Sequence, residues 1–289
     1  YIFFCPEATT RGWRKNGYFE AIEADHDAVL VVGSPEVYDL RAEYAFPPFA
    51  AAKVQFCGYI AREPGRQSRA AVRQQLGVAD GEPLVLVTPG GGEDGHGLVA
   101  ACLEGLRALP LAERPRTHIV CGPEMGEPAR AAIVQASAAL PSVSLQEFSD
   151  DLMSLMAAAD VVLSMGGYNT VCELLTLHKR AVVVPRVKPV AEQGIRAARM
   201  AARGLLRTLH PQDLSPAALW RDSFLSDPLE IVDQPLALGG IRNTLELHRR
   251  AGHRAARIRQ EAVEALPGPP STKILQRLRI VEIAHRCHA

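Results

Sequence analysis

The sequence lacks the patterns that mark several large classes of protein. It has no run of the roughly 18 apolar residues that a membrane-spanning helix needs, and it has no signal-peptide pattern. Its 32 basic and 32 acidic residues balance to a formal net charge of zero. Without an overall basic field, nucleic acid is not an expected partner. We expect a compact cytoplasmic protein with no transmembrane segment.

Cysteine pairs with the spacing of zinc ligands are also absent. The six cysteines lie far apart, without a C-x-x-C pair, and several fall inside apolar runs. This pattern indicates neither a disulfide framework nor a zinc site. We therefore expect reduced thiols in a core and no bound metal. We also expect neither a dinucleotide-binding fingerprint nor a P-loop motif, which argues against a dehydrogenase and a P-loop ATPase.

The chain does contain a regular alternation of apolar strands and helices. Strands are predicted over residues 84–88, 118–121, 143–146, 161–163, 181–184 and 205–208, and helices over residues 97–109, 128–140, 151–158, 170–177 and 192–203. Strands this apolar, separated by helices, imply a parallel sheet covered on both faces. The predicted fold class is α/β, with a doubly wound, Rossmann-like sheet that binds ligands outside the carboxyl ends of its strands.

The residues before this alternation indicate part of a second α/β domain. Helices are predicted over residues 13–23 and 37–44 and strands over residues 28–32 and 54–59, too few to close a sheet. A charged segment with Pro64 and Gly65 predicts a linker, which places a domain boundary near Glu63. The chain starts at Tyr1 within sequence of folded character, so we expect a segment upstream to be missing. The domains expected are a partial acceptor-side domain (residues 1–62), a donor-binding domain (residues 63–226) and a helical extension (residues 227–289).

The helical extension is predicted to contain long helices over residues 241–266 and 273–285, after a shorter helix at residues 216–224. The first long helix gathers five arginines: Arg249, Arg250, Arg254, Arg257 and Arg259. They could contact an anionic membrane surface, but a solvated helix face is the simpler interpretation.

The strongest candidate for a binding site is the turn after the strand at residues 161–163. Gly166 and Gly167 form this turn, and without Cβ atoms they let the backbone approach a ligand closely. The helix that follows points free N–H groups and the positive end of its dipole at the same place. We therefore predict that the segment Gly166, Gly167, Tyr168, Asn169 and Thr170 binds an anion.

Thr170 and Glu173 allow two interpretations. Thr-x-x-Glu at the start of a helix is a capping box, which needs no ligand. Alternatively, Glu173 offers its carboxylate oxygens to two vicinal hydroxyls, such as those of a nucleotide ribose. The double glycine favours binding, although the residues by themselves leave both interpretations open.

A second candidate phosphate site is the run Gly90, Gly91 and Gly92, which follows the strand at residues 84–88. Glu93 and Asp94 come next and would repel a pyrophosphate unless they turn away. The acidic pair makes this site a weaker candidate than the double glycine.

Two single side chains are weaker candidates still. His96 could act as a general acid or base, although a lone loop histidine is more often simply solvated. Phe148, just after the strand at residues 143–146, could pack on a planar base or could equally be an ordinary core aromatic.

Glu192 and Gln193 open a helix after a proline-stiffened loop that begins at Pro185. A carboxylate near a helix start is favoured by the dipole whatever its function. In the functional interpretation, both side chains hydrogen-bond the hydroxyls of a sugar held beside a diphosphate.

These segments together resemble the carboxy-terminal donor domain of GT-B glycosyltransferases, most closely family 28, which contains the MurG-type enzymes. The resemblance covers roughly residues 83–219. Residues 1–59 resemble the end of the acceptor domain of an uncharacterised branch of the same superfamily. The donor-domain motifs that carry the resemblance are Ala159 to Ser164, Gly166-Gly167, Thr170, Glu173, Val182 to Pro185, Glu192-Gln193 and Ala197.

The resemblance implies a nucleotide-diphosphate sugar as donor, with a UDP-sugar favoured, and an acceptor of unknown identity. It places the ribose on Glu173, the diphosphate at Gly167 to Thr170 and the first glycine loop, and the hexose near Glu192 and Gln193. It implies no cofactor and no metal, because the helix N-terminus neutralises the leaving diphosphate.

The sequence departs from the family in two places, and both concern the donor sugar. Glu192-Gln193 and Arg196 stand where MurG-like proteins carry His-Gln and a later Asn, and the first glycine loop carries the acidic Glu93-Asp94. We predict a metal-independent hexosyltransferase. The alternatives are a nucleotide-sugar-binding fragment without turnover and a nucleotide-sugar 2-epimerase, because fold analogy does not distinguish among the three.

Overall fold

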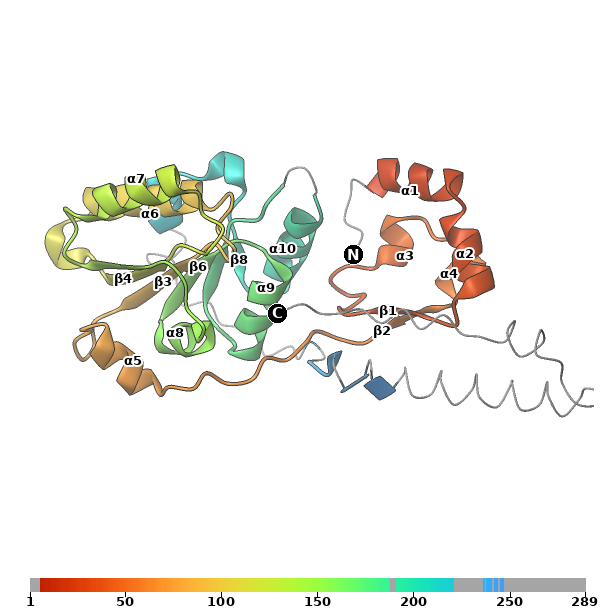
Figure 1. Ribbon diagram of the computed structural model, residues 1–289, viewed down its shortest axis with the longest axis horizontal. Helices are drawn as coiled ribbons and strands as arrows, with labels where there is room; N and C mark the ends of the chain where they lie inside the picture. The colour runs from red at the N-terminus through yellow and green to blue at the C-terminus, as the bar shows by residue number, and fades with distance from the viewer. Residues whose placement is uncertain are drawn as a thin grey trace, which may run out of the picture. The chain divides into compact units, whose positions relative to one another are not determined.

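The computed structural model describes residues 6–187, 191–220, 236, 238–240, 242–243 and 245–246 (Figure 1). The described residues up to Gly240 belong to one compact unit. Most of the predicted helix at residues 241–266, its arginine cluster and the helix at residues 273–285 lie outside the described residues. The domain boundaries after residues 62 and 226 stay predictions.

A six-stranded parallel sheet forms the centre of this unit. Its strands are β3 (Leu84–Thr88), β4 (Arg116–Val120), β5 (Val143–Gln146), β6 (Val161–Ser164), β7 (Ala181–Val183) and β8 (Arg207–Thr208). They lie in the order β5-β4-β3-β6-β7-β8, and every neighbouring pair is parallel. The prediction of a parallel α/β sheet is confirmed.

Helices cover both faces of the sheet, because successive strand residues point to opposite sides. Leu84 and Leu86 pack toward α5 (Arg69–Gln75), α8 (Leu152–Ala158), α9 (Tyr168–Thr176) and α10 (Glu192–Ala202). Val85 and Val87 pack toward α6 (His96–Ala108), α7 (Glu127–Ser137) and α11 (Pro216–Trp220), and Figure 1 shows α6 and α7 across the sheet from α8. Two short 3₁₀ turns, η1 (Leu111–Glu113) and η2 (Pro211–Asp213), complete this part. The sheet is therefore doubly wound.

The strand order reverses between β3 and β6. From β3 the chain winds to one edge through β4 and β5, then returns beside β3 as β6 and winds to the other edge. In open α/β sheets such a switch point leaves a crevice at the carboxyl ends of the two central strands. The glycine loop after β3 and the double-glycine turn after β6 therefore lie at the same crevice.

The amino-terminal part holds a separate pair of parallel strands, β1 (Val29–Val31) and β2 (Val54–Phe56). Its helices are α1 (Pro6–Lys15), α2 (Tyr18–Asp25), α3 (Leu40–Glu43) and α4 (Pro48–Ala51). The single helix predicted over residues 13–23 is instead two helices. Gly17 between them takes a left-handed conformation, φ 68°, which breaks the helical path.

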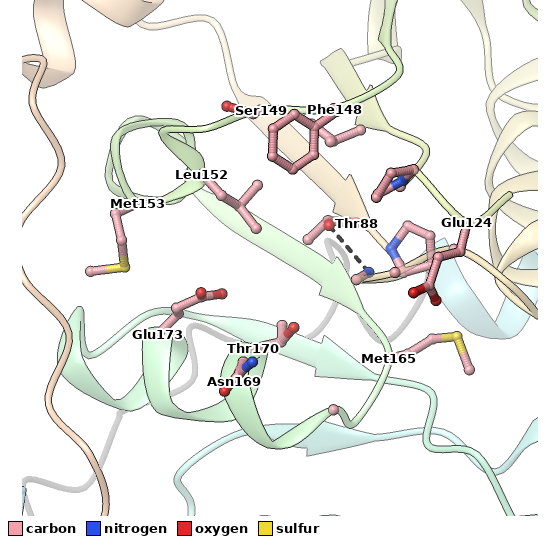
Figure 2. A pocket seen from close by; sticks show the side chains of 18 of the residues that line it. Thr88, Glu124, Phe148, Ser149, Leu152, Met153, Met165, Asn169, Thr170 and Glu173 are labelled. Carbon is pink, nitrogen blue, oxygen red and sulfur yellow. Dashed lines mark hydrogen bonds between the residues drawn. The ribbon is translucent and has the colours of Figure 1, made fainter. Parts of the chain in front are cut away.

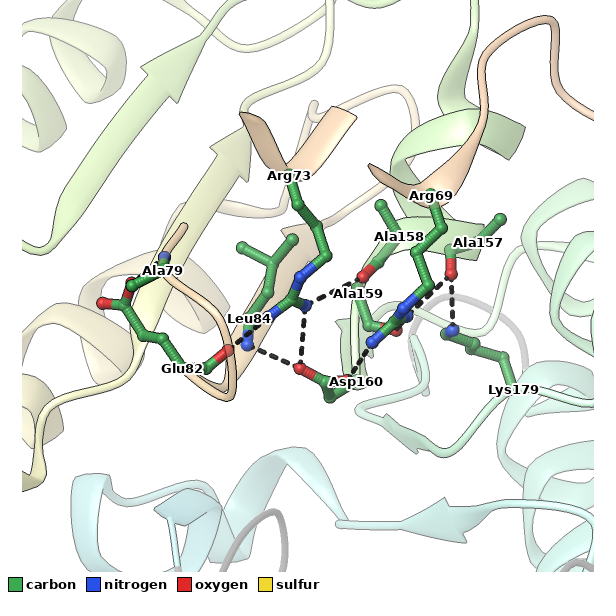
Figure 3. Close-up of polar contacts among 10 residues, drawn as sticks. All are labelled: Arg69, Arg73, Ala79, Glu82, Leu84, Ala157, Ala158, Ala159, Asp160 and Lys179. Carbon is green, nitrogen blue, oxygen red and sulfur yellow. Dashed lines mark hydrogen bonds and ion pairs between the residues drawn. The ribbon is translucent and has the colours of Figure 1, made fainter. Parts of the chain in front are cut away.

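Asp160 ties α5 to the amino ends of the central strands, opposite the crevice (Figure 3). Its carboxylate accepts the Leu84 N–H at 2.8 Å and pairs with Arg69 at 2.5 Å and Arg73 at 3.2 Å. The two arginines also donate to backbone carbonyl oxygens at residues 157–159. Helix α5, which the sequence analysis did not predict, is held in place by these contacts.

The described core buries four cysteines, namely Cys57, Cys102, Cys121 and Cys172. Among the helices of the described part, none has the length and apolar character needed to cross a membrane.

Candidate functional site

A cavity of about 940 Å³ opens at the carboxyl ends of β3, β4 and β6. Its size is typical of small-molecule sites. Three of the residues proposed from sequence, Gly166, Glu192 and His96, do not line it. The other proposed residues do line it: Gly90, Gly91, Gly92, Phe148, Gly167, Tyr168, Asn169, Thr170, Glu173 and Gln193.

Helix α9 presents an uncapped amino terminus to this cavity. It begins at Tyr168, two residues earlier than predicted, with Gly167 as N-cap and no side-chain capping bond. Thr170 is therefore the third helical residue, and it forms no capping box with Glu173. The first N–H groups of a helix have no partner within it, and the dipole makes this end positive. Free N–H groups at a cavity wall suit a bound anion.

The two glycine loops that follow β3 and β4 pack backbone against backbone. A Cβ atom at Gly122 would lie 2.4 Å from the carbonyl oxygens of Gly90 and Gly91, and one at Gly92 would lie 2.4 Å from that of Cys121. Gly92 and Gly122 also have φ values of +98° and +92°. Only glycine combines this conformation with such close approach. The glycine run therefore shapes the cavity wall.

The spacing of the glycines in this loop shows that the expected absence of a dinucleotide-binding fingerprint was wrong. Gly90, Gly92 and Gly95 fit the pattern G-x-G-x-x-G, between a strand and a helix. In dinucleotide-binding folds these glycines allow a tight turn, close approach to the phosphates and helix packing. Here Gly95 packs on Pro89, because a Cβ atom at Gly95 would lie 2.1 Å from the Pro89 Cβ. The spacing supports phosphate binding near this turn.

Glu173 lies within α9, about one turn from the uncapped end, and points into the cavity (Figure 2). The side chain is half-buried, and burial raises the pKa of its carboxyl group, while nearby Arg62 lowers it in part. Phe148 and Leu152 lie across the opening from Glu173 and Thr170. Phe148 is 57% exposed, so it is not a core aromatic, and its ring is available to a ligand.

The acidic residues of the first glycine loop are held by Arg186, which follows β7. Its guanidinium pairs with Asp94 at 2.6 Å and approaches Glu93 at 3.8 Å. These contacts offset the charges that would otherwise repel a phosphate in the loop.

Arg62 is a cavity residue that the sequence analysis missed. It lies in the segment predicted as a linker, and its backbone N–H donates to Thr176 Oγ1 at 3.1 Å. Within the described residues its buried Nε atom has no hydrogen-bond partner. Charge in a predicted linker normally indicates solvent exposure, so only the fold brings this guanidinium to the site.

Gln193 and Glu192 are adjacent in sequence but face different surroundings. Gln193 lines the cavity, and its Oε1 accepts the Arg186 N–H at 3.1 Å. Glu192 is 8% exposed and forms an ion pair with Arg196 behind the double-glycine turn. Glu192 therefore does not reach into the cavity as expected, because its carboxylate points toward Arg196.

His96 is exposed at the first position of α6, and it does not line the cavity. Its predicted part in acid–base chemistry has no support from this placement. Gly166 does not line the cavity either. Its backbone carbonyl oxygen accepts a hydrogen bond from Arg196.

The sequence that forms the six-stranded sheet matches the model of a known family. Residues 84–222 match the model of the glycosyltransferase family 28 C-terminal domain. An uncharacterized glycosyltransferase of Methanopyrus kandleri is 29% identical over 203 residues, covering 70% of this chain and 53% of that protein.

A second relative, from Verminephrobacter eiseniae, is 34% identical over 167 residues, covering 55% of this chain and 45% of that protein. It is named as a UDP-N-acetylglucosamine–N-acetylmuramyl-(pentapeptide) pyrophosphoryl-undecaprenol N-acetylglucosamine transferase. The chain thus spans about half the length of these two curated relatives.

A solved structure, a glycosyltransferase from Rickettsia africae, superposes with a TM-score of 0.54 at 16% identity, covering 82% of this chain and 67% of that one. This likeness concerns the fold alone. Residues 84–222 of this chain are thus similar to the C-terminal domain of glycosyltransferase family 28 and to MurG-type relatives, and the fold is like that of a solved glycosyltransferase.

Proposed function

We propose that this chain is the donor-binding part of a glycosyltransferase that moves a hexosyl group from a UDP-sugar to an acceptor without a bound metal. The observation that carries the proposal is that Glu173 and the uncapped amino terminus of α9 line the same cavity. A nucleoside diphosphate presents two ribose hydroxyls and two phosphates. The Glu173 carboxylate can accept hydrogen bonds from the hydroxyls, and the N–H groups at the start of α9 can donate to the phosphates.

The diphosphate would lie at Gly167 to Thr170, beside the glycine loop after β3. The N–H groups there and the α9 dipole would stabilise the negative charge that develops as the sugar leaves. Arg62 adds a positive charge to the same cavity. These groups supply the neutralisation that a metal ion would otherwise provide, which supports metal-independent transfer.

The remaining parts of the donor would use the two flanks of the cavity. Phe148 offers a ring face on which a planar base could stack. Gln193 lines the cavity, and its Nε2 amide would donate to a sugar hydroxyl while its Oε1 accepts the Arg186 backbone N–H. The name of the Verminephrobacter eiseniae relative specifies UDP-N-acetylglucosamine, which makes a UDP-sugar the first candidate here.

Thermal unfolding in the presence of ligands tests the proposal. UDP at a hundredfold excess over its Kd should stabilise the chain by about 2.7 kcal/mol, with EDTA present throughout. Uridine and inorganic phosphate, tested separately, should each stabilise it less. Stabilisation by phosphate equal to that by UDP would contradict the assignment of Glu173 to the ribose.

A turnover assay distinguishes sugar transfer from 2-epimerisation and from donor binding without turnover. UDP-N-acetylglucosamine incubated with the chain and analysed by NMR should show release of UDP with transfer of the sugar when an acceptor is supplied. Inversion at the sugar C2 would indicate a 2-epimerase. Binding of UDP without any turnover would indicate a fragment that only binds the donor.

A further inference from the structure

The Gly166–Gly167 peptide is held from behind by the buried side chain of Arg196. Arg196 is 5% exposed, and its Nη2 donates to the Gly166 carbonyl oxygen at 2.5 Å. Its Nη1 donates to Glu192, one turn earlier on α10. Neither Arg196 nor Glu192 lines the cavity. The pair therefore contacts the double-glycine turn from the side away from a ligand.

A buried ion pair needs a reason beyond stability. Taking both charges out of water is costly, and apolar side chains of similar volume often stabilise a fold equally well. Burial raises the pKa of the Glu192 carboxyl group, while Arg196 lowers it, so the pair compensates the charge that it buries. Apolar side chains, however, could not donate a hydrogen bond to the Gly166 carbonyl oxygen, as Arg196 does.

Holding this carbonyl sets the direction of the next N–H group. A peptide unit is planar and trans, so its C=O and N–H bonds point in opposite directions. With Gly166 O turned to Arg196, the Gly167 N–H points away from Arg196, and Gly167 lines the cavity. Two adjacent glycines restrict the backbone little by themselves. The orientation of this peptide therefore depends on an external contact.

The same guanidinium also contacts the residue after the turn. It lies 5.9 Å from the centre of the Tyr168 ring, and Tyr168 stacks on Tyr59 at 6.1 Å. Tyr168 is the first residue of α9. Arg196 thus touches the chain on both sides of Gly167.

We propose that Arg196, with Glu192 as its counter-ion, is the positioning residue of the diphosphate-binding turn and aligns the Gly167 N–H with a ligand phosphate. The inference rests on the proposed function, which puts the diphosphate at this turn. It assigns Glu192 a place behind the turn and leaves Gln193 as the residue that meets the sugar.

The test uses a double variant, Glu192→Leu with Arg196→Met, which leaves no unpaired charge in the core and so keeps the fold. Its UDP affinity should fall roughly tenfold or more, the loss expected for a misaligned hydrogen bond to a charged group. Its affinity for uridine, which has no phosphate, should stay that of the wild type. Arg203→Met is the matched control, because Arg203 follows α10 and pairs with Glu36 outside the cavity. This control should bind UDP like the wild type.

Titrations followed by NMR give all of these affinities. Unchanged UDP binding by the double variant, or equal losses for UDP and uridine, would overturn the positioning role. The variant should also lose affinity for UDP and UDP-N-acetylglucosamine to the same extent. A loss confined to the sugar nucleotide would instead place Glu192 on the sugar and overturn the inference.

The amide resonance of Gly167 provides a readout that needs no ligand. It should shift and exchange faster with solvent in the double variant, but not in Arg203→Met. If the wild-type chain fails to bind UDP, the proposed function falls, while this resonance still decides whether Arg196 orients the peptide. An unchanged Gly167 resonance in the double variant would overturn the inference.

Discussion

Arg62 and Glu173 both line the cavity, yet no ion pair joins the two side chains in the described structure; burial raises the pKa of the Glu173 carboxyl group, and the guanidinium lowers it only in part. A carboxylate and a guanidinium that are not paired with each other both keep hydrogen-bonding capacity for a ligand. Ribose hydroxyls suit the carboxylate, and a phosphate or a base carbonyl suits the guanidinium. This arrangement makes Glu173 the first residue to test.

Glu173→Gln should weaken UDP binding by about 1.5–3 kcal/mol, because the ribose hydroxyls would lose an ionised acceptor. Its melting temperature should not fall. Burial raises the pKa of Glu173, so this group stabilises the fold below its ordinary pKa of 4.5 and loses that contribution as the pH rises through the raised value. A neutral Gln avoids that loss. Calorimetric titration and thermal unfolding measure both effects, and UDP binding equal to wild type would exclude the ribose contact.

The pH dependence of UDP binding should report the same carboxyl group. Because the pKa of Glu173 is raised, protonation begins above the ordinary value of 4.5 and removes the acceptor. The wild-type advantage over Glu173→Gln should therefore shrink as the pH falls from neutrality toward that value. Protonation of UDP itself affects both proteins alike. A constant ratio of the two Kd values across this range would contradict the prediction.

Gly122→Ala should destabilise the fold and reduce UDP binding. The new methyl group would meet the carbonyl oxygens of Gly90 and Gly91 at 2.4 Å, and φ is +92° at this position. We expect a loss of about 1–3 kcal/mol in the free energy of unfolding. Gly97→Ala is the matched control, because a Cβ atom there meets nothing within 4 Å and Gly97 lies in helix α6. This control should be neutral or stabilising by up to about 1 kcal/mol. Urea unfolding of both variants checks the contrast.

Gln193→Ala should distinguish the sugar from the nucleotide. Gln193 lines the cavity and its Oε1 accepts the Arg186 N–H, so under the proposed function its Nε2 amide donates to a sugar hydroxyl. Affinity for UDP-N-acetylglucosamine should fall by about 0.5–1.5 kcal/mol, the usual net value of a neutral hydrogen bond. Affinity for UDP should change less. Equal losses for both ligands would assign Gln193 to the loop at Arg186 and not to the sugar.

Asp160→Asn should lower the free energy of unfolding without touching the cavity. Burial raises the pKa of Asp160, but the hydrogen bonds from Leu84, Arg69 and Arg73 outweigh it and lower the pKa below 3.8. A lowered pKa contributes stability above 3.8 that is lost as the pH falls through the folded value. We expect a cost of about 1–2 kcal/mol at neutral pH, modest because the carboxylate is 37% exposed.

The difference between wild type and Asp160→Asn should diminish as the pH falls below 3.8. Asp150→Asn serves as control, since Asp150 pairs with Arg66 at 75% exposure and should cost no more than about 1 kcal/mol. Denaturant titrations at several pH values measure both variants. A cost for Asp160→Asn that does not change with pH would contradict the role of its charge.

The sequence by itself determined the local elements of the donor domain and the chemistry of its main turns. The strands at Leu84–Thr88 and Val143–Gln146 have the predicted bounds, because a continuous apolar run in the first and an alternating apolar and polar pattern in the second, each between turn residues, leave little choice of element. Gly90 to Gly92 and Gly167 to Thr170 follow their strands in the sequence itself. A parallel sheet then requires that both loops lie at its carboxyl edge.

Only the tertiary structure decided which loops became neighbours. A strand's apolar pattern does not report which strand lies beside it, so the pairing of β3 with β6 was not predictable from that pattern, and only the family resemblance placed both glycine loops at one diphosphate. The pairing brings the loops so close that a Cβ atom added at Gly90 would lie 3.7 Å from Thr170 Oγ1. Arg62 reached the cavity because the linker binds Thr176, 114 residues away. Glu192 turned inward because Arg196 offered a buried partner. The Glu192–Arg196 pair spans only one helical turn, but it is buried because Arg196 also binds the Gly166 carbonyl, 30 residues away. All three placements therefore depend on long-range contacts, which local sequence periodicity does not contain.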